Sequence, residues 1–129
     1  MRRPAQALVE FALAISVFLL LVLGTFDLGR AYLAYTVMAN VAREASRYGA
    51  AHIGDLNWDT AAVQAGKNLA VGIDSSPSAL SLTAVATTID TLTYIKVSGA
   101  YRFHSLTPLV GTLMGDPIII LVDTSALAG

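Results

Sequence analysis

The stretch ALVEFALAISVFLLLVLGTF, at positions 7–26, decides the architecture of this chain. No side chain from position 11 to position 26 carries a formal charge. At 1.5 Å per helical residue, positions 7–26 span about 30 Å, which matches the hydrocarbon core of a bilayer. Arg2 and Arg3 precede the stretch and predict a cytoplasmic N-terminus, with everything after Asp27 on the outer side. The sequence therefore predicts a membrane-spanning helix.

The composition of the whole chain points the same way. Of its 129 residues, 55% are apolar and 13% are charged, against about 45–50% and about 25% in ordinary soluble domains. The length admits one folding unit, which excludes a multidomain enzyme. A net charge of −1 gives no reason to expect nucleic acid as a partner. The absence of cysteine excludes disulfides, thiolate zinc sites and thiol catalysis.

The apolar stretch continues into an amphipathic helix. Residues 24–30 lack the Ala-x-Ala pattern of a secretory cleavage site, and no proline occurs in residues 27–48. We expect one helix over residues 6–52, with residues 7–26 as its membrane or filament core and residues 27–52 as its amphipathic half. Side chains for helix–helix packing recur every three or four positions: Leu28, Ala31, Tyr35, Met38, Ala42 and Ala45. The opposite, polar side is predicted to carry Asp27, Arg30, Asn40, Arg43, Glu44 and Arg47.

The remaining residues, 53–129, predict a small extracytoplasmic domain. Its fold class is α+β: the long helix packs on a small antiparallel β-sheet with one or two short helices. The first short helix is expected to begin at Asp55 or Asn57 and to run toward Gly72. Strands are predicted by alternating or apolar patterns, with Gly99 as a candidate bulge and the last strand either central or covered on both faces; they cover residues 80–89, 94–103 and 118–122. A second short helix is expected over residues 107–114.

No constellation of residues predicts catalysis, a metal site or a cofactor. His52 and His104 have no second histidine three or four positions away, so a transition metal would lack ligands. Glycines occur singly, which excludes a glycine-rich phosphate loop. The chain is therefore not expected to be an enzyme.

Residues 5–13, AQALVEFAL, resemble the processing region of type IV prepilins, and most closely that of the TadE/TadG-like pilins of Tad pilus systems. The resemblance implies cleavage between Ala5 and Gln6, which leaves Glu10 as the fifth residue of the mature chain, followed by Phe11. Further similar segments lie at residues 27–30, 42–50 and 106–111. The chain departs from the usual pattern at Ala5, where glycine is commoner, and at Ser16, where proline is frequent. The absence of proline favours an uninterrupted helix.

The chemistry of Glu10 can be argued from the residues themselves. An isolated carboxylate at membrane depth costs at least about 2.5–3.5 kcal/mol. Cleavage would create a positive α-amine on Gln6, and a buried ammonium–carboxylate pair is tolerated where its geometry compensates desolvation. The resemblance implies that Glu10 of one subunit meets the Gln6 amine of another and sets the axial register. The alternative is a Glu10 that extends to the lipid headgroups.

The resemblance implies a type IV pilin-like fold and a structural role. The chain would be a homo-oligomeric pilus subunit, anchored in the cytoplasmic membrane as a precursor and extracellular after assembly. Its partners would be a prepilin peptidase, an assembly ATPase and a platform protein, and both a major and a minor subunit fit the sequence. The alternative is a single-pass surface binding or adhesion module that never polymerises.

Overall fold

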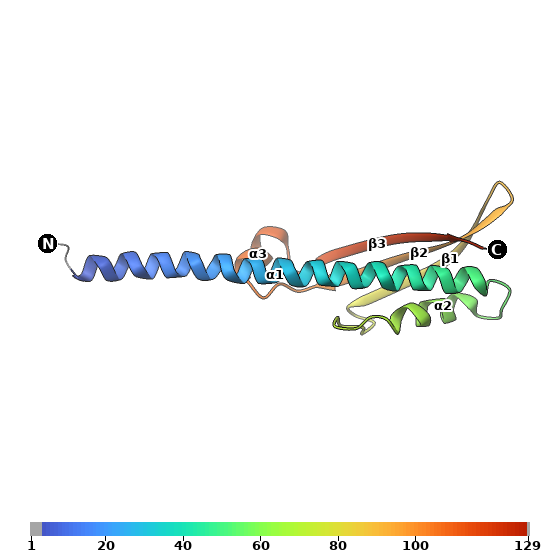
Figure 1. Cartoon of the computed structure of the whole chain (residues 1–129), viewed down its shortest axis with the longest axis horizontal. Coiled ribbons are helices and arrows are strands. Elements are labelled where there is room, and N and C mark those ends of the chain that lie inside the picture. The colour runs from blue at the N-terminus through green and yellow to red at the C-terminus, as the bar shows by residue number, and fades with distance from the viewer. Residues whose placement is uncertain (1–3, 129) are drawn as a thin grey trace.

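The computed structural model describes residues 4–128, with no description of the Leu109 side chain. Figure 1 shows one long helix with the rest of the chain gathered along its C-terminal half, while the N-terminal half stands alone. Arg2 and Arg3, predicted to orient the helix, lie outside the described residues. The elements in chain order are α1 (Pro4–Ala51), α2 (Trp58–Lys67), β1 (Leu80–Ile89), β2 (Leu92–Phe103), α3 (Pro108–Met114) and β3 (Ile118–Leu127).

The predicted long helix is confirmed by α1. Its 48 residues correspond to a rod about 72 Å long. Pro4 is its first residue, where the missing N–H costs nothing because that group has no partner within the helix. The helix runs to Ala51 without a break and is followed by turns around Gly54. The predicted α+β class, with this helix packed on a small antiparallel sheet and two short helices, is also confirmed.

The sheet is an antiparallel meander in the order β1-β2-β3. Gly99 pairs with Leu82 on one side and with Val122 on the other in an unbroken register, so the predicted bulge is wrong. A Cβ at Gly99 would lie 2.9 Å from Cε of Met38 in α1. The glycine therefore allows α1 to approach the centre of the sheet closely.

The last strand is neither central nor covered on both faces, so this prediction is also wrong. β3 lies at an edge of the sheet, and β2 occupies the centre. Ile118 and Ile120 face α1, whereas Ile119 and Leu121 are exposed on the outer face. The sequence pattern indicates that both faces of this strand are apolar. It does not indicate whether other residues of the same chain cover both faces.

α2 is shorter than predicted. It follows Asn57, which adopts a left-handed conformation (φ 60°) and forms no side-chain capping hydrogen bond. The helix ends at Lys67, so Leu69 and Ala70 lie beyond it. Gly66 brings α2 against α1, because a Cβ there would lie only 2.7 Å from the carbonyl oxygen of Val41.

The core lies between α1, the inner face of the sheet and α2. Alternate residues of β2 point into it, as the strand pattern predicted. Packing of the small domain on the rod is thereby confirmed. One cluster gathers around Ala34, Met38, Leu80, Tyr101 and Phe103, and the other around Ala42, Ala45, Ile95 and Val97.

Candidate assembly surface

The N-terminal half of α1 has no cover from its own chain. Every residue from 4 to 23 is exposed, including Phe11 and the large aliphatic side chains that follow it. The helix is long and apolar enough to cross a membrane by length and composition. Folding of one copy therefore leaves a large apolar surface, which lipid or other protein would have to cover to remove it from water.

Two hydroxyls within this surface are satisfied by the helix itself. Ser16 donates a hydrogen bond to the carbonyl of Ala12, and Thr25 donates one to the carbonyl of Leu21, each at 2.8 Å. Bonds of this kind lower the cost of placing a hydroxyl in an apolar environment. Glu10 differs, because within residues 4–128 its exposed carboxylate has neither an ion pair nor a side-chain hydrogen bond.

The expected cleavage position lies in the first turn of α1. Ala5 and Gln6 are both helical and exposed, directly after Pro4. The backbone N–H groups of a first turn have no partners within the helix, so this end unwinds more easily than any interior turn. Cleavage between Ala5 and Gln6 stays a prediction.

The predicted packing stripe is divided between two environments. Met38, Ala42 and Ala45 are buried against the sheet and α2, and Ala31 is partly buried at the edge of the first cluster. Leu28 and Tyr35 are exposed. Their contribution to helix–helix packing stays a prediction about contacts with another copy.

Asp27 does not lie on the polar side of α1 as predicted; it is 2% exposed. Its Oδ1 accepts a hydrogen bond from the backbone N–H of Leu106 at 3.0 Å, and its Oδ2 accepts one from the N–H of Thr107 at 2.7 Å. We call these three residues the Asp27 anchor. The anchor joins α1 to the loop before α3, and sequence reasoning missed it because its two parts are 80 positions apart.

The anchor favours the ionised carboxylate. The N–H of Leu106 is the largest cause that holds the pKa of Asp27 below its ordinary value of 3.8, while burial acts in the opposite direction. The N–H of Thr107 and the guanidinium of Arg30, 3.5 Å from Oδ1, add to the lowering. The anchor is therefore a charge-assisted pair of hydrogen bonds.

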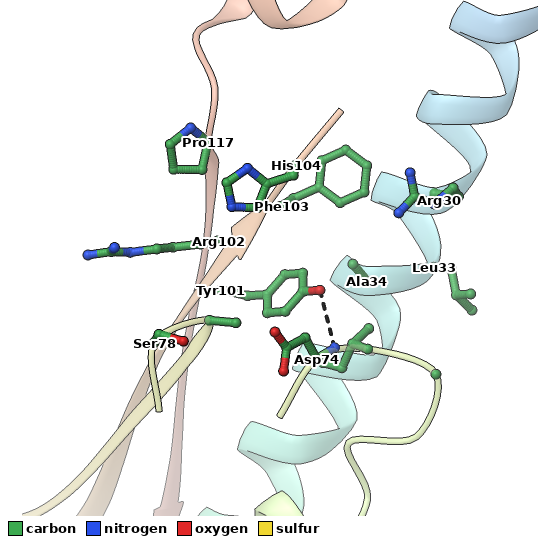
Figure 2. Close-up of a pocket in the computed structure, with 13 residues that line it drawn as sticks. Arg30, Leu33, Ala34, Asp74, Ser78, Tyr101, Arg102, Phe103, His104 and Pro117 are labelled. Carbon is green, nitrogen blue, oxygen red and sulfur yellow. Dashed lines mark hydrogen bonds between the residues drawn. The ribbon is translucent and has the colours of Figure 1, made fainter. Parts of the chain in front are cut away.

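A cavity of about 470 Å³ lies between α1 and the end of β2. The residues of α1 that line it follow Asp27 in the sequence. Figure 2 shows Tyr101 and Phe103 projecting from β2 toward α1, where Arg30 and Ala34 lie. The Tyr101 hydroxyl accepts the N–H of Asp74 at 3.4 Å. The guanidinium carbon of Arg30 lies 5.3 Å from the centre of the Phe103 ring, a cation–π distance. These contacts join α1, β2 and the loop after α2.

The polar side of the C-terminal half of α1, which we call its upper half, carries hydrogen-bonded polar side chains. Arg47 donates to both carboxylate oxygens of Glu44, at 2.9 and 2.6 Å, and Arg43 donates to the side-chain oxygen of Asn40 at 3.1 Å. The pairing with Arg47 lowers the pKa of Glu44. The guanidinium of Arg47 is thus engaged by a carboxylate of its own helix.

The two histidines make separate local contacts. His52 stacks on Tyr48 with ring centroids 4.1 Å apart, and its Nδ1 lies 2.9 Å from the Tyr48 carbonyl oxygen. His104 lies 3.1 Å from a carboxylate oxygen of Asp116, at the base of the loop that holds α3. Within residues 4–128 no group of three or more potential metal ligands is found.

Comparison with known families finds a match, and it lies in the long helix. A family model described as TadE-like protein matches residues 5–47, which cover most of α1 and none of the sheet. The resemblance drawn from residues 5–13 is thereby confirmed. No curated protein and no solved structure matches the chain.

Proposed function

We propose that this chain, whose N-terminal helix is TadE-like, is a structural subunit of a Tad-type pilus and polymerises through α1. The TadE-like match supports an association with Tad pili, and the role is structural rather than enzymatic. The precursor is anchored in the cytoplasmic membrane by residues 7–26, with its N-terminus inside and its sheet domain outside. After cleavage between Ala5 and Gln6 the subunit leaves the membrane and enters an extracellular filament.

The observation that carries this proposal is the contrast between the two halves of one continuous helix. The upper half buries Met38, Ala42 and Ala45 against its own sheet, whereas residues 4–23 are exposed throughout. A lipid bilayer can cover the lower half before assembly. In a filament, the lower halves of many copies would cover one another, because apolar surface is stabilised by removal from water in either case.

Glu10 supplies the register in this account. Apolar helix faces can slide along one another at small cost, whereas a buried carboxylate is strongly destabilised unless it finds a partner. The α-amine of Gln6 in a neighbouring subunit is the partner that cleavage creates. Phe11, adjacent in sequence and exposed, contributes apolar area beside the pair. One axial offset between subunits satisfies both charges.

The assembly requires partners that handle the membrane precursor. We propose a prepilin peptidase that acts at Ala5, an assembly ATPase that supplies the energy and a platform protein that transfers it. Like subunits then form the homo-oligomer.

The direct test is Glu10→Ala in the full chain, expressed together with its assembly machinery. Ser16→Ala is the matched control, because Ser16 lies in the same exposed segment and its hydroxyl bonds only to its own helix. We expect filaments from wild type and Ser16→Ala, and a loss of at least tenfold in filament mass from Glu10→Ala while membrane insertion persists. Filaments at wild-type level from Glu10→Ala would refute the register. Absence of filaments from wild type, with the chain held as a membrane monomer, would favour the binding module.

A further inference from the structure

The loop that holds α3 is an apolar platform at the end of the membrane segment. Residues 105–115 contain no charged side chain. Leu106 is 64% exposed, Leu113 77% and Met114 72%. The hydroxyl of Thr112 donates to the carbonyl of Pro108 at 2.7 Å, which satisfies a polar group of the helix internally. One folded copy therefore leaves this platform uncovered.

The height of the platform along the rod is set by the Asp27 anchor. The N–H groups of Leu106 and Thr107 bond to Asp27, one residue past the end of the apolar segment 7–26. In Figure 1, α3 lies nearer to the N-terminal end of the long helix than the sheet does. The contact between Nδ1 of His104 and a carboxylate oxygen of Asp116, at 3.1 Å, closes the base of the same loop. α3 is thus held next to the membrane end of the domain.

The dimensions of a bilayer decide what surrounds a helix at this height. The headgroup zone on each side of the hydrocarbon core is roughly 5–8 Å thick, which corresponds to about three to five helical residues of α1 beyond position 26. α3 has seven residues and is about 10 Å long. Because α3 is attached at position 27, it cannot avoid the headgroup zone when residues 7–26 fill the core.

We infer that α3 is an interfacial membrane contact in the precursor, with Leu106, Leu113 and Met114 among lipid headgroups and upper acyl chains. The occupant of this surface is the outer leaflet of the bilayer that α1 crosses. The loop that holds α3 is fixed at Asp27, directly after the apolar segment 7–26. The lack of charge in residues 105–115 fits an apolar contact rather than recognition of a particular headgroup. This inference rests on the membrane anchoring within the proposed function and does not require polymerisation.

The chain contains no cysteine, so a single introduced thiol can be labelled without background. Leu113→Cys, carrying an environment-sensitive fluorophore, reports on α3. Leu56→Cys is the matched control, since Leu56 is 92% exposed and lies just beyond the far end of α1. Leu20→Cys reports on insertion of the transmembrane segment. Each full-length variant is inserted into phosphatidylcholine vesicles that contain lipids with a quencher near the headgroup or at the middle of the acyl chain.

We expect the headgroup-level quencher to reduce the signal at position 113 at least threefold more than at position 56, at every protein-to-lipid ratio. Asp27→Asn in the same background should reduce that difference, because it frees the platform. Equal quenching at positions 113 and 56, with position 20 quenched, overturns the inference and leaves membrane anchoring intact. Protection of position 113 only at high protein density assigns the surface to a second copy and overturns it too. If position 20 escapes quenching, anchoring and the inference both fail.

Discussion

The N–H of Thr107 donates a 2.7 Å hydrogen bond to Oδ2 of Asp27 across 80 positions of sequence. This bond joins the rod to the chain segment between β2 and β3, at the boundary between the uncovered and the covered half of α1. The same carboxylate accepts the N–H of Leu106. Asp27, which the sequence pattern placed on the polar side of the helix, thus holds a distant loop against α1.

Replacing Asp27 by asparagine should release this anchor. The amide NH2 is a donor and would face one of the two backbone N–H groups, so one hydrogen bond is lost and a repulsive contact replaces it. We expect at least a tenfold loss of hydrogen-exchange protection at the Leu106 and Thr107 amides, measured in detergent-solubilised full chain. Asp55→Asn is the control, because Asp55 is exposed. Unchanged protection in Asp27→Asn would mean that the anchor does not hold the loop.

The contribution of Asp27 to stability should depend on pH in one direction. Because its pKa is lowered in the folded chain, the stabilisation is complete above the ordinary value of 3.8 and is lost as the pH falls through the folded-state pKa. The difference in Tm between wild type and Asp27→Asn should be constant from pH 8 to about pH 5 and should shrink at lower pH. Glu44 and Asp74 also have lowered pKa values, and subtraction of the variant removes their contribution. A difference that grows on acidification would contradict the account.

Gly66 should not tolerate alanine. A Cβ there would lie 2.7 Å from the carbonyl oxygen of Val41 and 3.0 Å from the Cβ of Ala45, so α2 would have to move away from α1. We expect Gly66→Ala to lower the free energy of unfolding by about 1–3 kcal/mol, despite the better helix propensity of alanine. Gly29→Ala, with nothing within 4 Å of its Cβ, should leave stability unchanged or raise it. Chemical denaturation of both variants measures the contrast, and equal stabilities would count against the close approach of α2.

Met38 and Leu28 should differ in what their loss impairs. Met38 is fully buried beneath Gly99, so Met38→Ala should lower the free energy of unfolding by about 2–5 kcal/mol. Leu28→Ala and Tyr35→Ala remove exposed side chains and should change the stability of one copy by less than about 0.5 kcal/mol.

The two exposed residues were nevertheless predicted to pack between helices. Leu28→Ala and Tyr35→Ala should therefore lower the yield of filaments while the thermal denaturation of the isolated chain stays at the wild-type temperature. Normal filament yield from both variants would remove Leu28 and Tyr35 from the proposed intersubunit surface.

Local patterns in the sequence predicted most of the fold. The helix of residues 6–52 differs from α1 by no more than two residues at either end, and the strand over residues 80–89 coincides with β1. These elements have strong periodicity or a long apolar run, so neighbouring residues determine them. The core side of β2 was predicted for the same reason.

The errors arise where a distant contact decides the outcome. Asp27 is polar and follows an apolar run, and only the fold reveals that a loop 80 positions away buries it. Gly99 resembled a bulge, but its function is to admit the Met38 side chain. β3 resembled a central strand because two of its outward-facing residues, Ile119 and Leu121, are apolar yet uncovered by the chain.

The central claim is that the uncovered half of α1 becomes the core of a filament. Material sheared from the surface of cells that express the full chain, imaged by electron microscopy and subjected to N-terminal sequencing, tests it most directly. We predict filaments whose subunit is this chain and begins at Gln6. Retention of the whole chain in the membrane fraction as a monomer, with no copy in sheared filaments, would contradict it.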